Sequence, residues 1–268
     1  MEPSAETLIA RATETEDAAL AVAGITNSEG AEASWGQSRI ALAASNGFAG
    51  RYQGSNHSIA VSVLAGTGTA MESDYDYSSA IFGSDLTDPV EIGRSAADRA
   101  LKKLGARKPP SAKVPVVFDP RVSGGLVRHL TSAINGAAIA RGTSFLKDKM
   151  GQAVMSSGIT IVDDPHRARG LASKPFDAEG LANKRRNLVE NGVLQTWILD
   201  LRAARQLGLT STGHASRGTS SPPSPSTTNL HLEPGTVSSG DLISDIKSGF
   251  YVTSVMGMGV NMVTGDYS

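Results

Sequence analysis

The sequence predicts an α+β protein that is rich in antiparallel sheet, and three observations support this class. Apolar and polar residues alternate with period two in strand-sized segments such as 57–64. Helical periodicity is confined to separate segments such as 89–104. Glycine is abundant (29 residues) and aromatic residues are few (5%), which suits a sheet-rich chain with many turns.

The N-terminal part predicts one helix followed by an antiparallel meander. Residues 3–24 have Leu8, Ala12 and Leu20 on one helical face. Ser45-Asn46-Gly47 is a strong turn signal between strand segments. The expected strands are 34–36, 39–43, 48–53, 57–64 and 67–76.

A second helix is predicted over 89–104, and a linker follows it. Asp88 is the candidate N-cap, Pro89 stands in the first turn, and Gly105 ends the helix. Ile92, Ala96, Ala100 and Leu104 are expected to form its inner face. Residues 107–112 contain two prolines, which exclude helix and central strand, so we expect a domain boundary there.

The second part opens with a short buried strand over 114–118 and one central helix over 124–145. Asp119-Pro120 is an entry signal for this helix, and Arg141-Gly142 closes it. Its face is so rich in alanine and glycine that its backbone can pack close to a neighbour, which predicts a deep position. A second short helix is expected over 144–152.

The remainder predicts short strands separated by turns. Asn191-Gly192 predicts a hairpin between 186–189 and 194–199, and Gly208 closes a helical turn over 203–207. Residues 210–226 have almost no bulky apolar side chain and predict a long exposed loop. The other expected elements are strands at 159–165, 229–232 and 250–255, a helix at 241–247, and a further strand led by 257–261 that ends in the turn 264–266.

Composition excludes several classes of protein. The formal net charge is −1 with interspersed charges, so no basic stripe indicates nucleic acid. The absence of cysteine excludes disulfides, thiolate metal ligands and a catalytic cysteine, and favours a reducing compartment. No window approaches the roughly 20 apolar residues of a membrane span, and the N-terminus does not resemble a signal peptide.

The candidate chemical groups do not define a reaction by themselves. The five histidines include no HExxH pair, and His129 stands alone on the central helix. Asp163-Asp164-Pro165-His166 is dense in ligand types, although Asp-Pro after a strand favours a turn. His214 and Arg217 lie in the polar loop and are better functional candidates. A serine hydrolase with His214 or His231 as base is conceivable, but no nucleophile elbow or triad is defined.

Several ordered segments resemble the TldD/PmbA metallopeptidase family, and the PmbA (TldE) branch in particular. They cover most of residues 34–268 and include FDAEG, LVENGVL, LDLRAA, LGLTSTGHA, TNL, EPG, GFYV and GMGVN through TGDYS. The resemblance implies a central domain with helices followed by a mixed α/β, barrel-like C-terminal domain. It also implies a cytoplasmic heterodimer in which a TldD-like subunit carries zinc on an HExxxH helix.

Carried over to this chain, the HExxxH motif is replaced. Arg141-Gly142-Thr143-Ser144 resembles the segment that follows the motif, and an ungapped frame from it places the ligand positions at Val127 and Ser132 and the glutamate position at Arg128. His129 is out of register, and no cysteine can serve as third ligand. A catalytic zinc needs about three protein ligands. We therefore expect no catalytic residue and no metal here, with zinc on the partner subunit.

The resemblance also implies partners and a site. The expected partners are a TldD-like subunit and a peptide or unfolded-protein substrate of the microcin or antitoxin type, with neither nucleic acid nor membrane. The expected peptide-cleft residues are His129, His214, Arg217 and Asn229. The expected domains are 1–106, a linker at 107–112, and 113–268. Family members extend beyond both ends, so the chain is expected to be a fragment with unpaired sheet edges and an incomplete core.

Two alternatives stay open. An autonomous hydrolase would use another site that includes Asp163, Asp164, His166 or His214. A regulatory or binding module would match the description of the PmbA branch as a modulator of DNA gyrase, although the near-neutral charge argues against direct DNA binding.

Overall fold

The computed structural model describes residues 2–256 and 259–267, and the chain divides into two compact units. The first unit comprises residues up to 40 together with 51–110, and the second comprises 41–50 together with 111–268. Helices and antiparallel sheets occur in both, which confirms the predicted α+β class. Within the described ranges, no helix has the length and apolar character needed to cross a bilayer.

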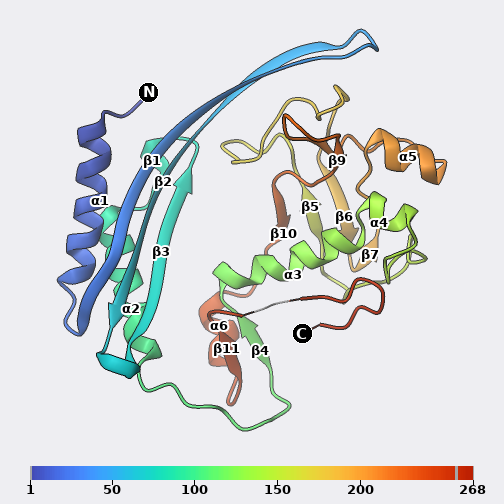
Figure 1. The fold of residues 1–268 in the computed structure, drawn as a ribbon. Helices are drawn as coiled ribbons and strands as arrows, with labels where there is room; N and C mark the ends of the chain where they lie inside the picture. Colours follow the sequence, from blue (N-terminus) through green and yellow to red (C-terminus); the bar gives the residue numbers. More distant parts are fainter. Residues whose placement is uncertain (1, 257–258, 268) are drawn as a thin grey trace. The chain divides into compact units, whose positions relative to one another are not determined.

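The first unit is a three-stranded sheet covered by two helices on one face (Figure 1). The strands β1 (Ile25–Ala43), β2 (Ala49–Ala65) and β3 (Glu72–Ala80) are neighbours in sequence order, as the predicted meander requires. The helices are α1 (Ala5–Leu20) and α2 (Pro89–Lys103), and the short 3₁₀ turns η1 (Gly68–Ala70) and η2 (Gly83–Asp85) flank β3.

Alternation along β2 builds the core of this unit. Ile59, Val61, Val63 and Ala65 are buried at every second position and pack with alanines of both helices. The predicted cap of α2 is confirmed, because the Asp88 carboxylate accepts from the N–H groups of Val90 and Glu91. The two leucines expected on inner faces, Leu20 and Leu104, are instead 43% and 38% exposed, since each lies at the end of its helix.

The crossing of α1 and α2 depends on a glycine. A Cβ on Gly93 would lie 2.3 Å from the carbonyl oxygen of Thr15 and 3.0 Å from the amide nitrogen of Ala19. Thr15 and Ala19 are the buried positions of α1, and both have 0% exposure. The helices therefore touch backbone to backbone at this point, and no larger residue fits there without displacement.

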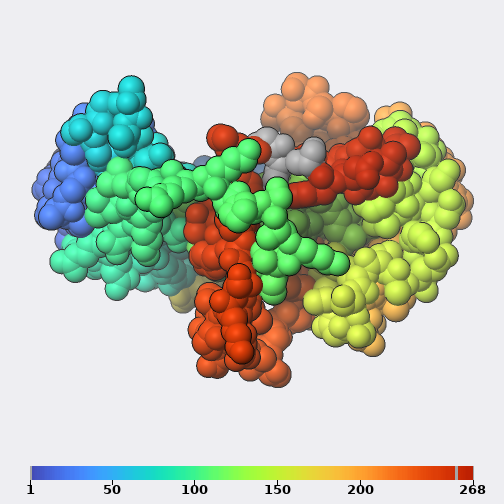
Figure 2. Space-filling model, turned by 90° about the horizontal axis from the view of Figure 1, so that it is seen from below, coloured from blue at the N-terminus to red at the C-terminus, as the bar shows by residue number. Residues whose placement is uncertain are grey.

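The second unit contains several small sheets. One has the order β10-β5-β6-β7 with antiparallel neighbours, and its strands are β5 (Ile161–Asp163), β6 (Arg186–Glu190), β7 (Val193–Leu194) and β10 (Leu230–Leu232). Strands β8 (Ala215–Ser216) and β9 (Ser224–Pro225) form an antiparallel pair. Strands β4 (Val116–Phe118) and β11 (Phe250–Val252) form a parallel pair. Figure 2 shows the segment of β4, in green, against the orange-red C-terminal residues.

The single central helix predicted over 124–145 is wrong. The structure has two helices, α3 (Pro120–Ala133) and α4 (Gly136–Ala140). The chain leaves helical geometry at Ile134, and the Asn135 side chain then accepts from the Ala137 N–H and caps α4. The Gly136 N–H donates to the carbonyl of Ile198, at 2.8 Å. Tertiary pairing with the 198 segment therefore replaces the helical bonds that would have continued α3.

The structure also corrects three other local predictions. Residues 144–152 form turns rather than a helix, because the Ser144 hydroxyl donates to the Ala133 carbonyl and accepts from the Leu146 N–H. Strand β4 is not buried, since Val116 is 49% exposed. The loop expected to be exposed is buried over 212–215.

The Asn-Gly hairpin is confirmed, and so is the glycine that ends the next helix. Asn191 and Gly192 have φ angles of 46° and 81°, as a turn with two left-handed residues requires. The helix α5 (Leu201–Leu207) ends at Gly208, with φ of 66°. The expected helix at 241–247 is present as α6 (Ser239–Ser244), which begins two residues earlier, after Ser238, and ends three residues earlier. The further strand led by 257–261 begins outside the described residues.

His57 is a buried histidine of the first unit. It opens the pairing of β2 with β3 opposite Ala80, is 5% exposed, and lies 6.5 Å from the Trp35 ring between centroids. Its Nδ1 has no hydrogen-bond partner in the part of the chain that is described. Burial, and then the charge of Arg11, hold the pKa of His57 below its usual 6.5.

We expect Gly93→Ala to destabilise the protein by about 2 kcal/mol, because the added methyl group forces α1 and α2 apart. The free energy of unfolding in urea measures this. Gly124→Ala is the matched control, since it lies in α3 with open space around its Cβ position and gains up to about 1 kcal/mol of helix propensity. Equal effects of the two substitutions would contradict the close crossing.

Lowering the pH is expected to destabilise the first unit through His57. Above pH 6.5 the imidazole is neutral in both states, and no penalty arises. Below 6.5 the unfolded chain binds the proton more readily, so stability falls until the pH has passed below the folded-state pKa. Denaturation at about pH 7.5 and about pH 5 tests this, and His57→Phe should show a smaller loss. An equal loss in that variant would argue against His57 as the source.

Candidate functional site

Helix α3 carries the two positions at which the family motif would place metal ligands, Val127 and Ser132, and the position of its glutamate, Arg128. Val127 is half-buried and packs against the core of the second unit. Arg128 is exposed, and its carbonyl accepts from the hydroxyl of Ser132 at 3.0 Å. An alkyl group, a guanidinium and an internally bonded hydroxyl do not fit a divalent cation. No group of three or more His, Cys, Asp or Glu residues suited to a metal occurs in the ranges 2–256 and 259–267.

His129 lies half-buried on the same helix. Its ring meets Tyr267 edge to face, with centroids 5.8 Å apart and an angle of 81° between planes. Its Nε2 is buried and lacks a hydrogen-bond partner among the described residues. A buried imidazole nitrogen without a partner costs about 1–3 kcal/mol, so Nε2 of His129 locally lowers the stability of the fold at α3.

His214 lies at the centre of a buried polar network rather than in an open loop. It is 2% exposed, and its Nε2 lies 3.2 Å from Oδ2 of Asp163. Its Nδ1 lies 2.8 Å from the hydroxyl of Thr212. Asp163 also accepts from the N–H of Thr228 at 2.6 Å and from its hydroxyl at 2.9 Å. Because Asp163 can only accept when ionised, Nε2 of His214 is assigned as the donor.

Lys174 and Asp177 extend this network along the neighbouring strand β8. Lys174 donates from Nζ to the Ala215 carbonyl at 3.2 Å, and Asp177 accepts from the Ala215 N–H at 3.1 Å. Burial lowers the pKa of Lys174, and the carboxylates of Asp177 and Asp163 oppose that shift. Neither residue is recognisable from the sequence as part of a site, because their partners lie far along the chain.

The start of α5 joins the same region. Asp200 accepts from the Ala203 N–H at 2.7 Å, and Glu179 accepts from the Leu201 N–H at 2.8 Å. Burial raises the pKa of Glu179, and the hydrogen bond from Leu201 opposes the rise. Two carboxylates at a helix start satisfy N–H groups that lack helical partners, so they stabilise this end of α5.

The remaining candidates have local structural roles. The Asn229 side chain donates to the Asp164 carbonyl at 2.6 Å and accepts from the Ala172 N–H at 3.0 Å, so it fixes the segment between them. The Asp164 carboxylate accepts from the His166 N–H, as in an Asx turn, and the His166 ring lies 2.8 Å from the Asn183 amide.

The structure brings only some of the candidates together. His214 and Asn229 are linked through Asp163 and Thr228, whereas Arg217 is exposed and donates to the carbonyl of Gly218 at 3.4 Å. Both ring nitrogens of His214 are engaged inside the protein, so the imidazole has no free atom for an external substrate. This network holds distant segments of the second unit together, so its role is structural, and we call it the brace.

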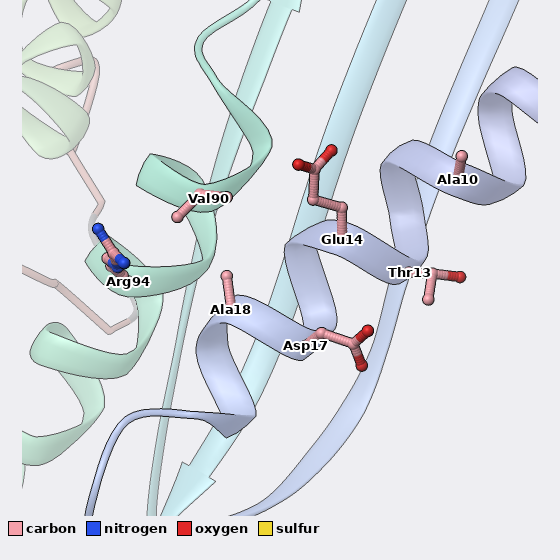
Figure 3. Close-up of a pocket in the computed structure, with 7 residues that line it drawn as sticks. All are labelled: Ala10, Thr13, Glu14, Asp17, Ala18, Val90 and Arg94. Atoms are coloured by element: carbon pink, nitrogen blue, oxygen red, sulfur yellow. The ribbon is translucent and has the colours of Figure 1, made fainter.

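A groove lies in the first unit between α1 and α2 (Figure 3). Its volume is about 750 Å³. Figure 3 shows Glu14 and Asp17 on α1 and Arg94 on α2 at its margin. The other lining residues are Ala10, Thr13, Ala18 and Val90. These side chains offer no nucleophile paired with a base, so the groove has no catalytic constellation.

Comparison with known proteins identifies similar domains over most of the chain. The family model of the PmbA/TldA metallopeptidase central domain matches residues 2–104, and that of the C-terminal domain matches residues 111–268. The chain is 36% identical over 268 residues to Metalloprotease PmbA of Escherichia coli O157:H7, covering 100% of this chain and 58% of that protein. It is 36% identical over 225 residues to the Metalloprotease PmbA homolog of Haemophilus influenzae, covering 84% of this chain and 48% of that protein. The chain thus spans about half the length of these curated relatives.

Solved structures share the fold. A crystal structure from Bacteroides thetaiotaomicron, described as a candidate modulator of DNA gyrase, has a TM-score of 0.90 and 30% identity over 99% of this chain and 58% of that chain. TldE from Thermococcus kodakarensis has a TM-score of 0.80 over 99% of this chain and 64% of that chain. Its identity of 22% indicates likeness of fold alone.

We expect Asp163→Asn to destabilise the protein by about 3 kcal/mol, because it leaves His214 and Thr228 without a charged buried acceptor. Chemical denaturation measures the loss. Asp164→Asn is the matched control, with a change below about 1 kcal/mol, since the neighbouring carboxylate is only half-buried. Equal stability of the two variants would show that the hydrogen bonds of Asp163 do not stabilise the protein as inferred.

Proposed function

The chain belongs to the PmbA/TldA metallopeptidase family, and we propose that it is the PmbA/TldE-like, noncatalytic subunit of a two-chain metallopeptidase. In this proposal the metal lies on a TldD-like partner subunit, and this chain binds no cofactor. The substrates are peptides or unfolded segments that the complex degrades or matures, and the complex acts in the cytoplasm.

One observation carries the noncatalytic assignment. The three motif positions on α3 hold Val127 packed against the core, Arg128 in solvent, and Ser132 bonded within the helix. A catalytic zinc needs about three nitrogen, oxygen or sulfur ligands and an open position for water. A guanidinium at the general-base position repels a divalent cation and cannot accept the proton that the reaction requires.

The proposal narrows the expected peptide-cleft residues. His214 is buried with both ring nitrogens engaged, and the Asn229 amide ties down the 164–173 segment. His129 and Arg217 remain as the candidates with side chains nearer the surface. We therefore assign peptide contact to these two residues.

The autonomous-hydrolase alternative has one specific observation behind it, the Asp163–His214 pair. A general base must reach the proton that it abstracts. This pair is buried, and its hydrogen bonds go to Thr212 and Thr228 within the protein. The brace role is therefore preferred to a catalytic one.

The purified chain is expected to contain only substoichiometric zinc by elemental analysis and to show no peptidase activity on casein or an unfolded peptide. Mixing it with a TldD-type partner should produce activity that neither chain has alone. Zinc-dependent hydrolysis by this chain without a partner would overturn the proposal.

Two variants sharpen this assay. Arg128→Ala should leave the activity of the mixture within about twofold, because an exposed arginine contributes no catalysis here. Replacing the HExxxH glutamate of the partner by glutamine should abolish the activity. A large loss of kcat from Arg128→Ala together with an unaffected partner variant would place the chemistry on this chain instead.

A further inference from the structure

Among the described residues, strand β3 is an edge of the sheet in the first unit. The order β1-β2-β3 places β2 on one side of it, and nine antiparallel residue pairs run from His57↔Ala80 to Ala65↔Glu72. A strand at a sheet edge presents unpaired N–H and C=O groups, which can pair with another chain. Tyr75 and Tyr77 are half-exposed on this strand and favour strand pairing, so an open edge would be a strong template.

Three outward backbone groups of β3 are bonded to side chains. The Tyr75 N–H donates to Oδ1 of Asp74 at 2.7 Å, and the Tyr77 N–H donates to Oδ1 of Asp76 at 2.8 Å. Nζ of Lys103 donates to the Ser73 carbonyl at 2.8 Å. In a strand, the N–H and C=O of one residue point to the same side, and alternate residues share that side. Residues 73, 75 and 77 therefore form the outward set.

Helix α2 holds both aspartates in place. The second oxygen of Asp74 lies 3.0 Å from Nζ of Lys103. The second oxygen of Asp76 accepts from the Ser95 hydroxyl and lies 3.8 Å from Nε of Arg99. Each carboxylate thus uses one oxygen for an edge N–H and the other for α2, which lies beside β3 in Figure 1.

We propose that Asp74 and Asp76, anchored by α2, close the edge of β3 to strand addition. A pairing strand would have to compete for the Tyr75 and Tyr77 N–H groups and break hydrogen bonds to charged acceptors. Neither an extended peptide nor a second copy of the chain then pairs along β3. Any strand-type contact of the proposed peptidase complex in this unit uses a different surface.

Amide hydrogen exchange on the full chain tests the closure. In monomeric protein, the Tyr75 and Tyr77 amides should exchange at least about tenfold more slowly than in an unstructured chain, since each is hydrogen-bonded. Sedimentation under the same conditions establishes the monomer. Exchange at the unstructured rate, or protection that appears only at concentrations where dimers form, would overturn the proposal.

A pair of substitutions at Asp76 isolates the acceptor. Asp76→Ala should speed exchange at Tyr77 by about tenfold and leave Tyr75 unchanged, because only the Tyr77 acceptor is removed. Asp76→Asn keeps an acceptor oxygen and should change Tyr77 by less than about threefold. Unchanged exchange at Tyr77 in Asp76→Ala would overturn the proposal. If that variant does not fold, loss of protection at Tyr75 reveals it, and the measurement on the unsubstituted chain decides.

Discussion

The carboxylate of Asp163 is the contact on which the second unit depends most. It accepts from His214 and from Thr228, which lies 65 residues further along the chain, and so it joins the end of β5 to the segment around β8 and to the start of β10. Next to it, Lys174 donates to the carbonyl of Ala215, and Asp177 accepts from the N–H of Ala215. A buried carboxylate is costly unless its hydrogen-bond partners are present. The three segments that these contacts join are therefore expected to fold as one unit.

The elements predicted well are those set by one or two residues acting locally. Asp88 caps α2, Asn191-Gly192 turns the hairpin, and Gly208 ends α5, because each effect needs only neighbouring backbone. The break between α3 and α4 could not be foreseen in this way. Asn135 and Gly136 are compatible with helix, and the chain leaves it because the Ile198 carbonyl takes the Gly136 N–H.

The candidate site also depends on contacts between distant residues, which local sequence patterns do not reveal. Polar composition over 210–226 predicts exposure, yet Thr212 and His214 are buried because Asp163, also predicted as a candidate, lies within reach of the imidazole. Hydrophobicity alone cannot distinguish a solvated polar loop from one whose polar groups pair inside the protein. The sequence marks Asp163 and His214 separately, and only the fold reveals that they satisfy each other.

His214 and His129 differ in whether their buried ring nitrogens have hydrogen-bond partners. His214 is buried and fully satisfied, which is the condition of a side chain selected for stability. His129 keeps a buried Nε2 without a partner among the described residues, whereas Val127 of the same helix packs against the core and Ser132 bonds to the Arg128 carbonyl. Natural proteins concentrate such local losses of stability at sites that serve another purpose. His129, rather than His214, is therefore the histidine at which contact with a peptide or a partner subunit should be sought.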